Sequence, residues 1–499
     1  MMNTLPFHDL KFGLESAERE ASRFPELLLS GFYDPFNICR EIEKGNIWMI
    51  LGPKGAGKSA ILEHIRLRSQ QNPNWFVRKI NLNEFPFIDL AGIDVGGETA
   101  QSRVPAIWSY LLLLEFMASL EKDQGAPGHR DRNFKVTVDA LKGRHLLPVD
   151  NIRDTVFKLA HVDLKAHPPG LEAGVSFERI SNSYPFYAVT DAIKRLVANF
   201  ETDSLHFLFV DGLDSLTIGE DDTARWQILT GLMIAANSLS NIFHECGSAA
   251  RIAVSCRSDL YFGLDIPDAR KLLDGSSVIL DWFPSSRQPQ DSHLFDLAEH
   301  KASVGAGRKV ANLVEEYLPR EVWYGRKGEE IDSYLMSYTR YTPRDYLKLL
   351  SYIAHHSPTR GLPVSRGVVE GAKDYAAAYF VDEVRSGLFL ALGRIWTPKF
   401  MDLLHTLNGN RFFASTLRSA ASADRRYRDL DLVVALHQMH RIGAIANSTS
   451  THSNPYLNFI YQNPRARLDL NQEIVLHNAL TRGMNRPRQR ASSGGGRQR

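Results

Sequence analysis

Short apolar runs alternate with amphipathic stretches over the first 285 residues. The run Ile-Trp-Met-Ile-Leu at 47–51 is short, continuous and followed by glycines, so it predicts a buried strand. The same two patterns recur along this part of the chain, with apolar runs at 75–80, 205–210 and 252–254 and helical spacing at 58–67, 107–120 and 225–239. Strands that alternate with helices predict an α/β domain with a parallel sheet covered on both faces.

The pattern changes after residue 285, where apolar residues recur every three to four positions. This spacing predicts a helical lid domain, with helices at 294–302, 310–317, 331–338 and 344–355. Farther on, four helices and two short strands are expected, at 374–392, 398–407, 412–420, 429–441, 443–447 and 456–462. Helices followed by a hairpin in this order predict a winged-helix domain.

These changes divide the chain into five expected parts. They are an N-terminal segment packed on the core (1–45), the α/β core (46–285), the helical lid (286–362), the winged-helix-like domain (363–484) and a disordered basic tail (485–499). The stretch 121–183 is rich in Gly, Pro, His and charge and lengthens the gap between two strands, so it is interpreted as an insertion in the core.

Composition, net charge and cysteine spacing limit the classes of protein to which this chain can belong. A chain of 499 residues with 43% apolar and 23% charged residues is an ordinary protein of two or three domains. The net charge of +2 combines a slightly acidic body with six arginines and no acid in 482–499, so any nucleic-acid surface is expected to be local. The three cysteines form no C-x-x-C pair, which argues against a disulfide framework or a zinc site. A cytoplasmic location without a membrane span is expected, because the first residues lack a signal-peptide pattern and the most apolar stretch contains Ser109 and Glu115.

The strongest motif lies between a predicted strand and a predicted helix, and it reads Gly52-Pro53-Lys54-Gly55-Ala56-Gly57-Lys58-Ser59. It matches G-x-x-x-x-G-K-[ST], in which glycines let successive backbone N–H groups point at a polyphosphate beside the positive end of a helix. Lys58 is expected to reach the β and γ phosphates, and the Ser59 hydroxyl to ligate Mg²⁺. The predicted nucleotide-binding segment runs from Gly52 to Ala60.

A second metal ligand is expected at the end of a neighbouring strand. The apolar run 205–210 leads directly into Asp211, which is predicted to hold Mg²⁺ together with Ser59. Gly212 follows, and the next acid is Asp214. Asp214 is the candidate base that polarises the attacking water, and the alternative is an N-cap or turn acid.

Two arginines are candidate catalytic residues that sense the γ-phosphate. Arg257 follows the strand at 252–254, and the alternative is that it pairs with Asp259. Arg344 lies after Pro343 in the first turn of a predicted helix, from which its side chain can reach back over a nucleotide. The alternative for Arg344 is a surface salt bridge.

Together these motifs resemble the AAA+ and STAND-like division of P-loop ATPases, and within it bacterial P-loop ATPases found beside phage-defence and mobile-element genes. The resemblance covers most of the chain and rests on the Walker A element and on segments within 12–32, 211–214, 257–259 and 343–345. It implies a P-loop NTPase core of parallel strands, a helical lid, a C-terminal winged helix, and ATP with Mg²⁺ as ligands. ATP is favoured over GTP because the chain lacks an Asn/Thr-Lys-x-Asp element.

Three functions stay open. The first is a slowly hydrolysing, ATP-dependent switch that regulates assembly or a separately encoded effector protein, with a role in antiphage defence. The second is a DNA-binding ATPase of initiator or transposition-helper type, in which the Arg tail and the winged helix bind DNA, with Arg418, Arg425, Arg426, Arg428 and Arg441 beside its recognition helix. The third, a small-molecule kinase, leaves the lid and winged helix without a role.

The first two functions also predict self-association. AAA+-like cores usually complete their site with an arginine from a neighbouring subunit, because charge on the transferring phosphoryl group is stabilised from the open side. Arg257 and Arg270 are the candidates for that arginine. We therefore expect a homo-oligomer favoured by ATP.

Overall fold

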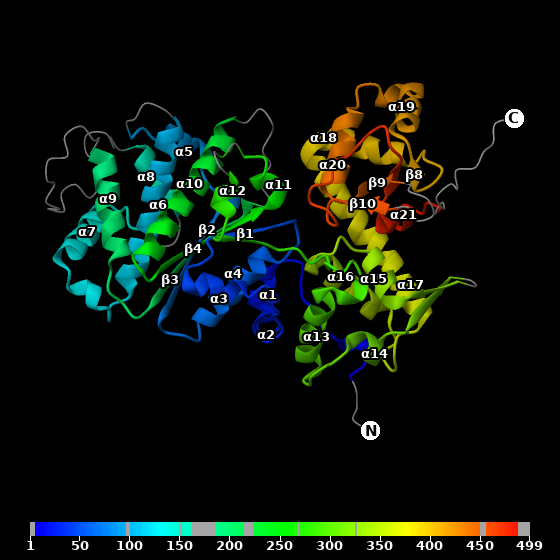
Figure 1. The fold of residues 1–499 in the computed structure, drawn as a ribbon, viewed down its shortest axis with the longest axis horizontal. Helices are drawn as coiled ribbons and strands as arrows, with labels where there is room; N and C mark the ends of the chain where they lie inside the picture. Colours follow the sequence, from blue (N-terminus) through cyan, green and yellow to red (C-terminus); the bar gives the residue numbers. More distant parts are fainter. Residues whose placement is uncertain are drawn as a thin grey trace. The chain divides into compact units, whose positions relative to one another are not determined.

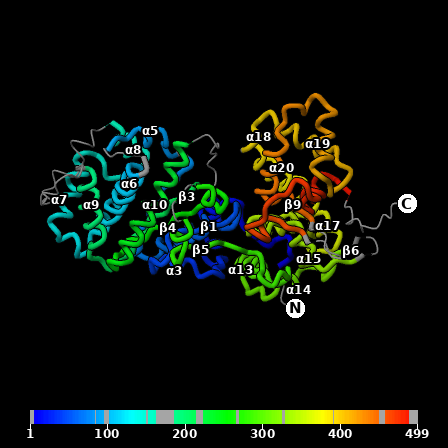
Figure 2. The backbone as a smooth tube through the Cα atoms, turned by 45° about the horizontal axis from the view of Figure 1, so that its top comes forward, coloured from blue at the N-terminus to red at the C-terminus, as the bar shows by residue number. Residues whose placement is uncertain are grey.

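The computed structural model describes residues 5–95, 100–148, 152–161, 185–213, 223–264, 266, 269–324, 327–449 and 456–487. The chain forms two compact units. One comprises Asp34–Leu280, and the other combines Met1–Tyr33 with Asp281–Arg499. Figure 1 shows the elements of each unit, and Figure 2 shows the backbone of each from a second direction.

The unit Asp34–Leu280 is built on a sheet that has five strands among its described residues, all parallel, in the order β2-β3-β4-β1-β5. These strands are β1 (Met49–Gly52), β2 (Trp75–Asn81), β3 (Leu205–Asp211), β4 (Ala250–Arg257) and β5 (Ser277–Ile279). The first four agree with the predicted strands. The edge strand β5 was missed, because its three residues are half-buried or exposed and form no apolar run.

Helices cover both faces of the sheet. The chain moves in one direction along the sheet from β1 to β2 and in the other from β2 through β3 to β4. Right-handed crossovers therefore place the connecting helices on opposite faces, and Figure 1 shows α3 and α4 on the face opposite α6 and α10. The helices of this unit are α3 (Ile38–Lys44), α4 (Lys58–Ser69), α5 (Phe87–Gly92), α6 (Ala100–Lys122), α7 (Arg132–Gly143), α8 (Ile152–Ala160), α9 (Pro185–Ala198), α10 (Thr223–Glu245), α11 (Ser258–Tyr261) and α12 (Ala269–Leu273), with 3₁₀ turns at Leu82–Glu84 and Pro127–Arg130.

The longest apolar helix belongs to the core of this unit. The segment Ser102–Lys122 of α6 is long and apolar enough to cross a membrane, with a mean hydropathy of 1.3, but 78% of its apolar window is buried inside the protein. Trp108 and the leucines at 111–114 are fully buried, and α6 packs along α10. Contacts within the protein therefore account for its composition. The expected insertion at 121–183 contributes α7 and α8 to the same unit, while residues 149–151 and 162–184 lie outside the described residues.

The second unit begins with the N-terminal residues, which pack with helices that follow Asp281. The Lys301 ammonium of α13 is ion-paired with Glu20 of α1 and also donates to the Leu27 carbonyl at 3.1 Å, and these side chains are buried. Residues 5–33 thus belong to this unit, whereas the sequence pattern assigns 1–45 to the core. The contacts that place them there, such as this ion pair and the packing of Phe7 against Tyr317, are long-range, so no local pattern reveals them. The helices here are α1 (Ala17–Arg23), α2 (Pro25–Leu29), α13 (His293–Ala306), α14 (Leu313–Tyr317), α15 (Ile331–Ser337) and α16 (Pro343–His356), with 3₁₀ turns at Phe7–Asp9 and Pro289–Asp291.

Two features of this unit differ from the expected helices. A hairpin of β6 (Glu321–Tyr324) and β7 (Lys327–Glu330) precedes α15. The expected helix 374–392 is divided between α17 (Ser365–Asp374), a π-helical segment (Tyr375–Phe380) and α18 (Val381–Leu404). Gly393 interrupts α18 with φ +68° and ψ −173°, so the expected helix at 398–407 is the second half of α18.

The C-terminal elements form a small antiparallel sheet with helices around it. The sheet has the order β10-β9-β11-β8 among the described residues. In chain order the elements are β8 (Arg411–Phe412), α19 (Ala414–Ala423), a 3₁₀ turn (Arg425–Tyr427), α20 (Leu432–Arg441), β9 (Ile445–Thr449), β10 (Tyr456–Asn458), β11 (Ile474–Leu476) and α21 (Asn478–Gly483). Arg486, expected in a disordered tail, donates from Nη1 to the Leu407 carbonyl at 2.9 Å and is part of this unit.

Candidate functional site

The glycine-rich loop joins β1 to α4 at the carboxyl edge of the parallel sheet. Gly55 and Gly57 have φ values of +85° and +98°, which residues with a Cβ rarely adopt. Gly57 is also the residue that caps the N-terminus of α4, a helix of 12 residues. The chain therefore needs glycine at these two positions to turn from the strand into the helix. The first N–H groups of α4 have no acceptor within the helix, and they lie next to this turn.

The loop lies where the sheet connections diverge. The chain leaves β1 through α4 on one face, and it leaves the adjacent strand β4 through α11 and α12 in the other direction along the sheet. Ligands of open parallel sheets bind outside the carboxyl ends of the strands at such a point. In the register of the sheet Gly52 is the partner of Arg257, so the end of β4 lies beside the first residue of the loop.

Lys58 is buried, with 3% of its surface exposed. Its ammonium donates to the carbonyls of Gly52 at 3.1 Å and of Pro53 at 3.0 Å. These bonds hold the lysine within the loop, and a phosphate bound at the N-terminus of α4 would offer it stronger, charged acceptors.

Asp211 lies close to Ser59, as the sequence predicted. The Ser59 hydroxyl donates to Asp211 Oδ1 at 3.3 Å, and the buried Ser255 of β4 donates to the same oxygen. Burial raises the pKa of Asp211. The Lys79 ammonium, the Ser255 hydroxyl and the Gly212 N–H together lower this pKa by more than burial raises it, so it lies below its ordinary value. The carboxylate is therefore ionised at neutral pH. A hydroxyl and an ionised carboxylate are oxygen ligands of the kind that Mg²⁺ prefers, so this pair fits the expected ion.

Three groups at this site were missed in the sequence. Lys79 of β2 and Glu63 of α4 form an ion pair with Nζ to Oε1 at 3.0 Å, and the same ammonium lies 3.2 Å from Asp211 Oδ2. Ser255 completes the set. Lys79, like Arg78 before it, is a charged residue inside the predicted strand 75–80, and Glu63 lies one helical turn after Ser59 inside the predicted helix 58–67. Both therefore carried a signal: a charge within an element that is predicted to pack in the core.

The candidate sensor Arg257 is paired with Asp259. Its Nε donates to Oδ1 at 2.9 Å and its Nη2 lies 2.5 Å from Oδ2. The alternative interpretation of Arg257 is therefore realised in this structure, although its backbone lies beside Gly52.

The structure describes neither of the other two catalytic candidates at this site, because one belongs to the second unit and the other lies outside the described residues. Arg344 is half-buried in the first turn of α16 and belongs to the unit of residues 281–499, whereas the loop belongs to the unit Asp34–Leu280. Asp214 lies outside the described residues, which end at Leu213 and resume at Thr223. The described part of the site therefore consists of Lys58, Ser59 and Asp211 with the three groups above.

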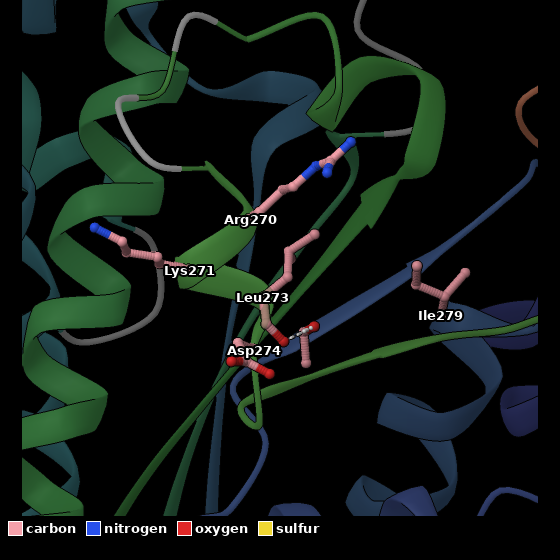
Figure 3. A pocket seen from close by; sticks show the side chains of 6 residues that line it. Arg270, Lys271, Leu273, Asp274 and Ile279 are labelled. Carbon is pink, nitrogen blue, oxygen red and sulfur yellow. Dashed lines mark hydrogen bonds between the residues drawn. The ribbon is translucent and has the colours of Figure 1, made fainter.

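A shallow hollow of about 460 Å³ lies between α12 and the edge strand β5. Figure 3 shows Arg270 and Lys271 of α12 pointing in different directions, with Ile279 on β5. The Ser277 hydroxyl donates to the Leu273 carbonyl at 2.6 Å across its floor. Since Arg270 and Lys271 are exposed and diverge, they do not converge on a common ligand.

Comparison with known proteins adds no relative. No protein-family model matches the chain, and no curated protein matches it.

Proposed function

We propose that the chain binds ATP with Mg²⁺ at the loop 52–60 and hydrolyses it slowly, as a nucleotide-dependent switch. The observation that carries the proposal is the 3.3 Å contact between the Ser59 hydroxyl and Asp211 Oδ1. It joins the last residue of the G-x-x-x-x-G-K-[ST] motif to an ionised carboxylate that lies far away in the sequence. A glycine-rich turn without a ligand has no need of this pairing.

Each group has a distinct role in the proposed reaction. The N–H groups of the loop and the end of α4 bind the β and γ phosphates, and Lys58 leaves the Gly52 and Pro53 carbonyls to reach them. Ser59 and Asp211 would hold Mg²⁺, which would supply positive charge that stabilises the phosphates. Asp214 stays the candidate base for the attacking water.

The test of the proposal is calorimetry with a non-hydrolysable ATP analogue and Mg²⁺. Lys58→Ala should weaken binding by about 100-fold or more, because the ammonium contacts the phosphates. Lys194→Ala is a matched control, since Lys194 pairs with Asp191 at 2.5 Å on α9 of the same unit. Equal affinities of the wild type and Lys58→Ala, with both proteins folded by circular dichroism, would contradict the proposal.

The switch function is tested by assembly. We propose that ATP favours a homo-oligomer, which then acts on a separately encoded effector protein, in antiphage defence or a related process. Sedimentation with ADP and with the ATP analogue should give a larger species with the analogue, and specific activity should rise with protein concentration. A monomer in both nucleotide states with constant specific activity would leave a switch that acts as a single chain.

A DNA-binding ATPase is the second candidate, and the surface of α20 favours it. Helix, strand, two helices and a hairpin follow one another between α18 and β10, an order that supports the proposed winged helix. α20 exposes Val433, Val434, His437 and Arg441 along one side, and both valines are 43% exposed. Apolar and basic side chains on one face suit contacts with base edges and phosphates.

The charges near α20 define the DNA test. Arg426 is engaged with Asp424 at 2.6 Å, whereas Arg425 and Arg428 are exposed and make no ion pair with any described residue. Arg425→Ala/Arg428→Ala should weaken DNA binding and reduce the salt slope by roughly 0.9 for each phosphate that the variant no longer neutralises. Arg385→Ala, an exposed arginine of α18, is the control. Absence of binding to any DNA at low salt would assign this part of the chain to protein docking.

A further inference from the structure

A chain of charged side chains runs from α4 through β2 to β3. Arg66 Nε donates to Glu63 Oε2 at 2.6 Å, Glu63 Oε1 accepts from Lys79 at 3.0 Å, and Lys79 lies 3.2 Å from Asp211 Oδ2. The side chains of Glu63 and Asp211 are each 5% exposed, and that of Lys79 is 20% exposed. One lysine thus bridges two buried carboxylates.

The two oxygens of Asp211 face different partners. Oδ1 accepts from the hydroxyls of Ser59 and Ser255, and Oδ2 faces the Lys79 ammonium. A divalent ion held by Ser59 and Asp211 would share this carboxylate with Lys79. The divalent ion and the Lys79 ammonium would then lie within a few ångströms of each other. Because the site is partly buried, solvent and salt only weakly screen the repulsion between these positive charges.

Glu63 offers the ammonium a second position. It is buried, it lies on α4 one turn after Ser59, and it already contacts Lys79. An ammonium on a flexible four-carbon stem can shift away from Asp211 and stay paired with Glu63. The Lys79 ammonium can therefore pair mainly with Asp211 or mainly with Glu63.

We infer that Lys79 is the counter-cation of the metal-free site, a positioning residue that holds Asp211 in place and lowers the affinity of this site for divalent ions, while Glu63 draws the ammonium away from Asp211. The inference rests on the proposed function in that the metal arrives with a nucleotide. It assigns to Lys79 and Glu63 a role that the loop motif does not include.

The inference predicts opposite changes in Mn²⁺ affinity for the variants Lys79→Met and Glu63→Gln. Lys79→Met removes the competing charge and should tighten Mn²⁺ binding by roughly three- to tenfold. Glu63→Gln leaves Lys79 with Asp211 as its one buried carboxylate in this chain of contacts and should weaken Mn²⁺ binding by roughly threefold. Lys79→Arg keeps the charge and should stay near the wild type. Lys142→Met removes a lysine that pairs with Glu121 on the same unit and is the matched control.

The experiment is a titration of each folded variant with Mn²⁺ alone, with the free ion measured by electron paramagnetic resonance, followed by the same titration with ADP present. A merely structural role of Lys79 would loosen Asp211, so Lys79→Met and Glu63→Gln would both weaken Mn²⁺ binding, and that result would overturn the inference. Equal Mn²⁺ affinities in all variants would overturn it as well. If Lys79→Met does not fold, Lys79→Gln takes its place: tighter Mn²⁺ binding by Lys79→Gln than by the wild type supports the inference, and equal or weaker binding overturns it.

Failure of the proposed function gives a different result. In that case the wild type binds no ADP with or without the metal, whereas the titration with Mn²⁺ alone still compares the variants. The two ideas are therefore separated by one set of proteins.

Discussion

Arg340 and Asp345 form a buried ion pair with two hydrogen bonds: Arg340 Nε donates to Asp345 Oδ2 and Nη2 donates to Oδ1, each at 2.8 Å. The Asp345 side chain is 1% exposed. The Tyr379 hydroxyl approaches the same carboxylate at 3.4 Å, and the guanidinium lies 5.0 Å from the centroid of the Phe380 ring. The pair therefore joins the start of α16 to the π-helical segment in one network.

Asp345→Asn should destabilise this unit by about 3–5 kcal/mol, because it removes the hydrogen-bonded carboxylate of the buried Arg340 guanidinium, and the Glu383 carboxylate lies farther away, at 3.9 Å. Asp382→Asn is the control, since Asp382 pairs with Arg385 at 2.8 Å on the surface, where such a pair contributes at most about 1 kcal/mol. Urea denaturation of both variants measures the difference. Equal decreases in unfolding free energy would show that the buried pair stabilises the unit no more than the surface pair.

Gly212→Ala should be more destabilising than Gly247→Ala. Both glycines have a positive φ, +92° and +61°, so each alanine carries a backbone strain of about 1–2 kcal/mol. A Cβ at Gly212 would also lie 2.5 Å from Asn81 Oδ1, whereas nothing lies within 4 Å of a Cβ at Gly247. Thermal midpoints of the two variants isolate the steric part. A shift of Asp211, the neighbour of Gly212, would in addition weaken nucleotide binding in the first variant alone.

Stability should fall as the pH drops from about 6.5 to about 4, in part because of His477. Burial lowers the pKa of His477 to about 4 in the folded protein, so the unfolded chain binds the proton more readily between these values. The stabilising effect of the neutral ring is present above the unfolded pKa and is lost as the pH falls toward the folded one. The neutral ring fits its contacts, since Nε2 lies 3.1 Å from the Thr339 carbonyl and Nδ1 accepts from the Ala479 N–H at 3.2 Å.

The measurement compares urea denaturation of the wild type and His477→Gln at pH 7 and pH 5. The variant should lose about 2 kcal/mol of the pH-dependent difference, at about 1.4 kcal/mol per pH unit. His206, buried on β3 with its pKa lowered to about 4, contributes over the same range in the other unit and is unchanged in the variant. An identical pH dependence of both proteins would contradict the role of His477.

Asp211→Asn should keep nucleotide binding and lose most of the effect of Mg²⁺ on it, because the amide lacks the charge that a divalent ion requires. We expect the ratio of ADP affinities with and without Mg²⁺ to fall about tenfold or more. Asp203→Asn, an exposed acid on the same unit, is the control. An unchanged Mg²⁺ dependence in Asp211→Asn would move the metal ligand to another acid.

Asp259→Asn should strengthen the preference for ATP over ADP if Arg257 senses the γ-phosphate, because the variant releases the guanidinium from the 2.5 Å ion pair. Arg257→Gln should abolish that preference. Affinities for ADP and a non-hydrolysable ATP analogue, measured by calorimetry, test both. If neither variant changes the ratio of the two affinities, Arg257 serves to order the end of β4. Asp274→Asn is the control, because it removes an unrelated exposed acid.

Much of the core followed from the sequence. The runs that form β1, β3 and β4 are apolar because these strands are buried between layers of helices, and burial is what hydrophobic periodicity records. The strand β2 is mostly half-buried, and its run includes Arg78 and Lys79. The loop 52–59 was likewise readable, because a turn that needs positive φ at Gly55 and Gly57 restricts the residue types there. Ser59 and Asp211 were predicted to hold Mg²⁺ together, one from the P-loop motif and the other from its position at the end of an apolar strand, and the structure has their side-chain oxygens 3.3 Å apart.

Tertiary structure decided the rest, since charged and polar pairs form across distances that carry no periodic signal. Lys79 meets Glu63 and Asp211 only when β2 lies next to β3 and beside α4. The N-terminal residues belong to the second unit, where Glu20 is ion-paired with Lys301, 281 positions away, and Phe7 packs against Tyr317. Such pairs depend on the fold that brings their partners together, because a charge is recognised by its neighbour in space and not by its spacing along the chain.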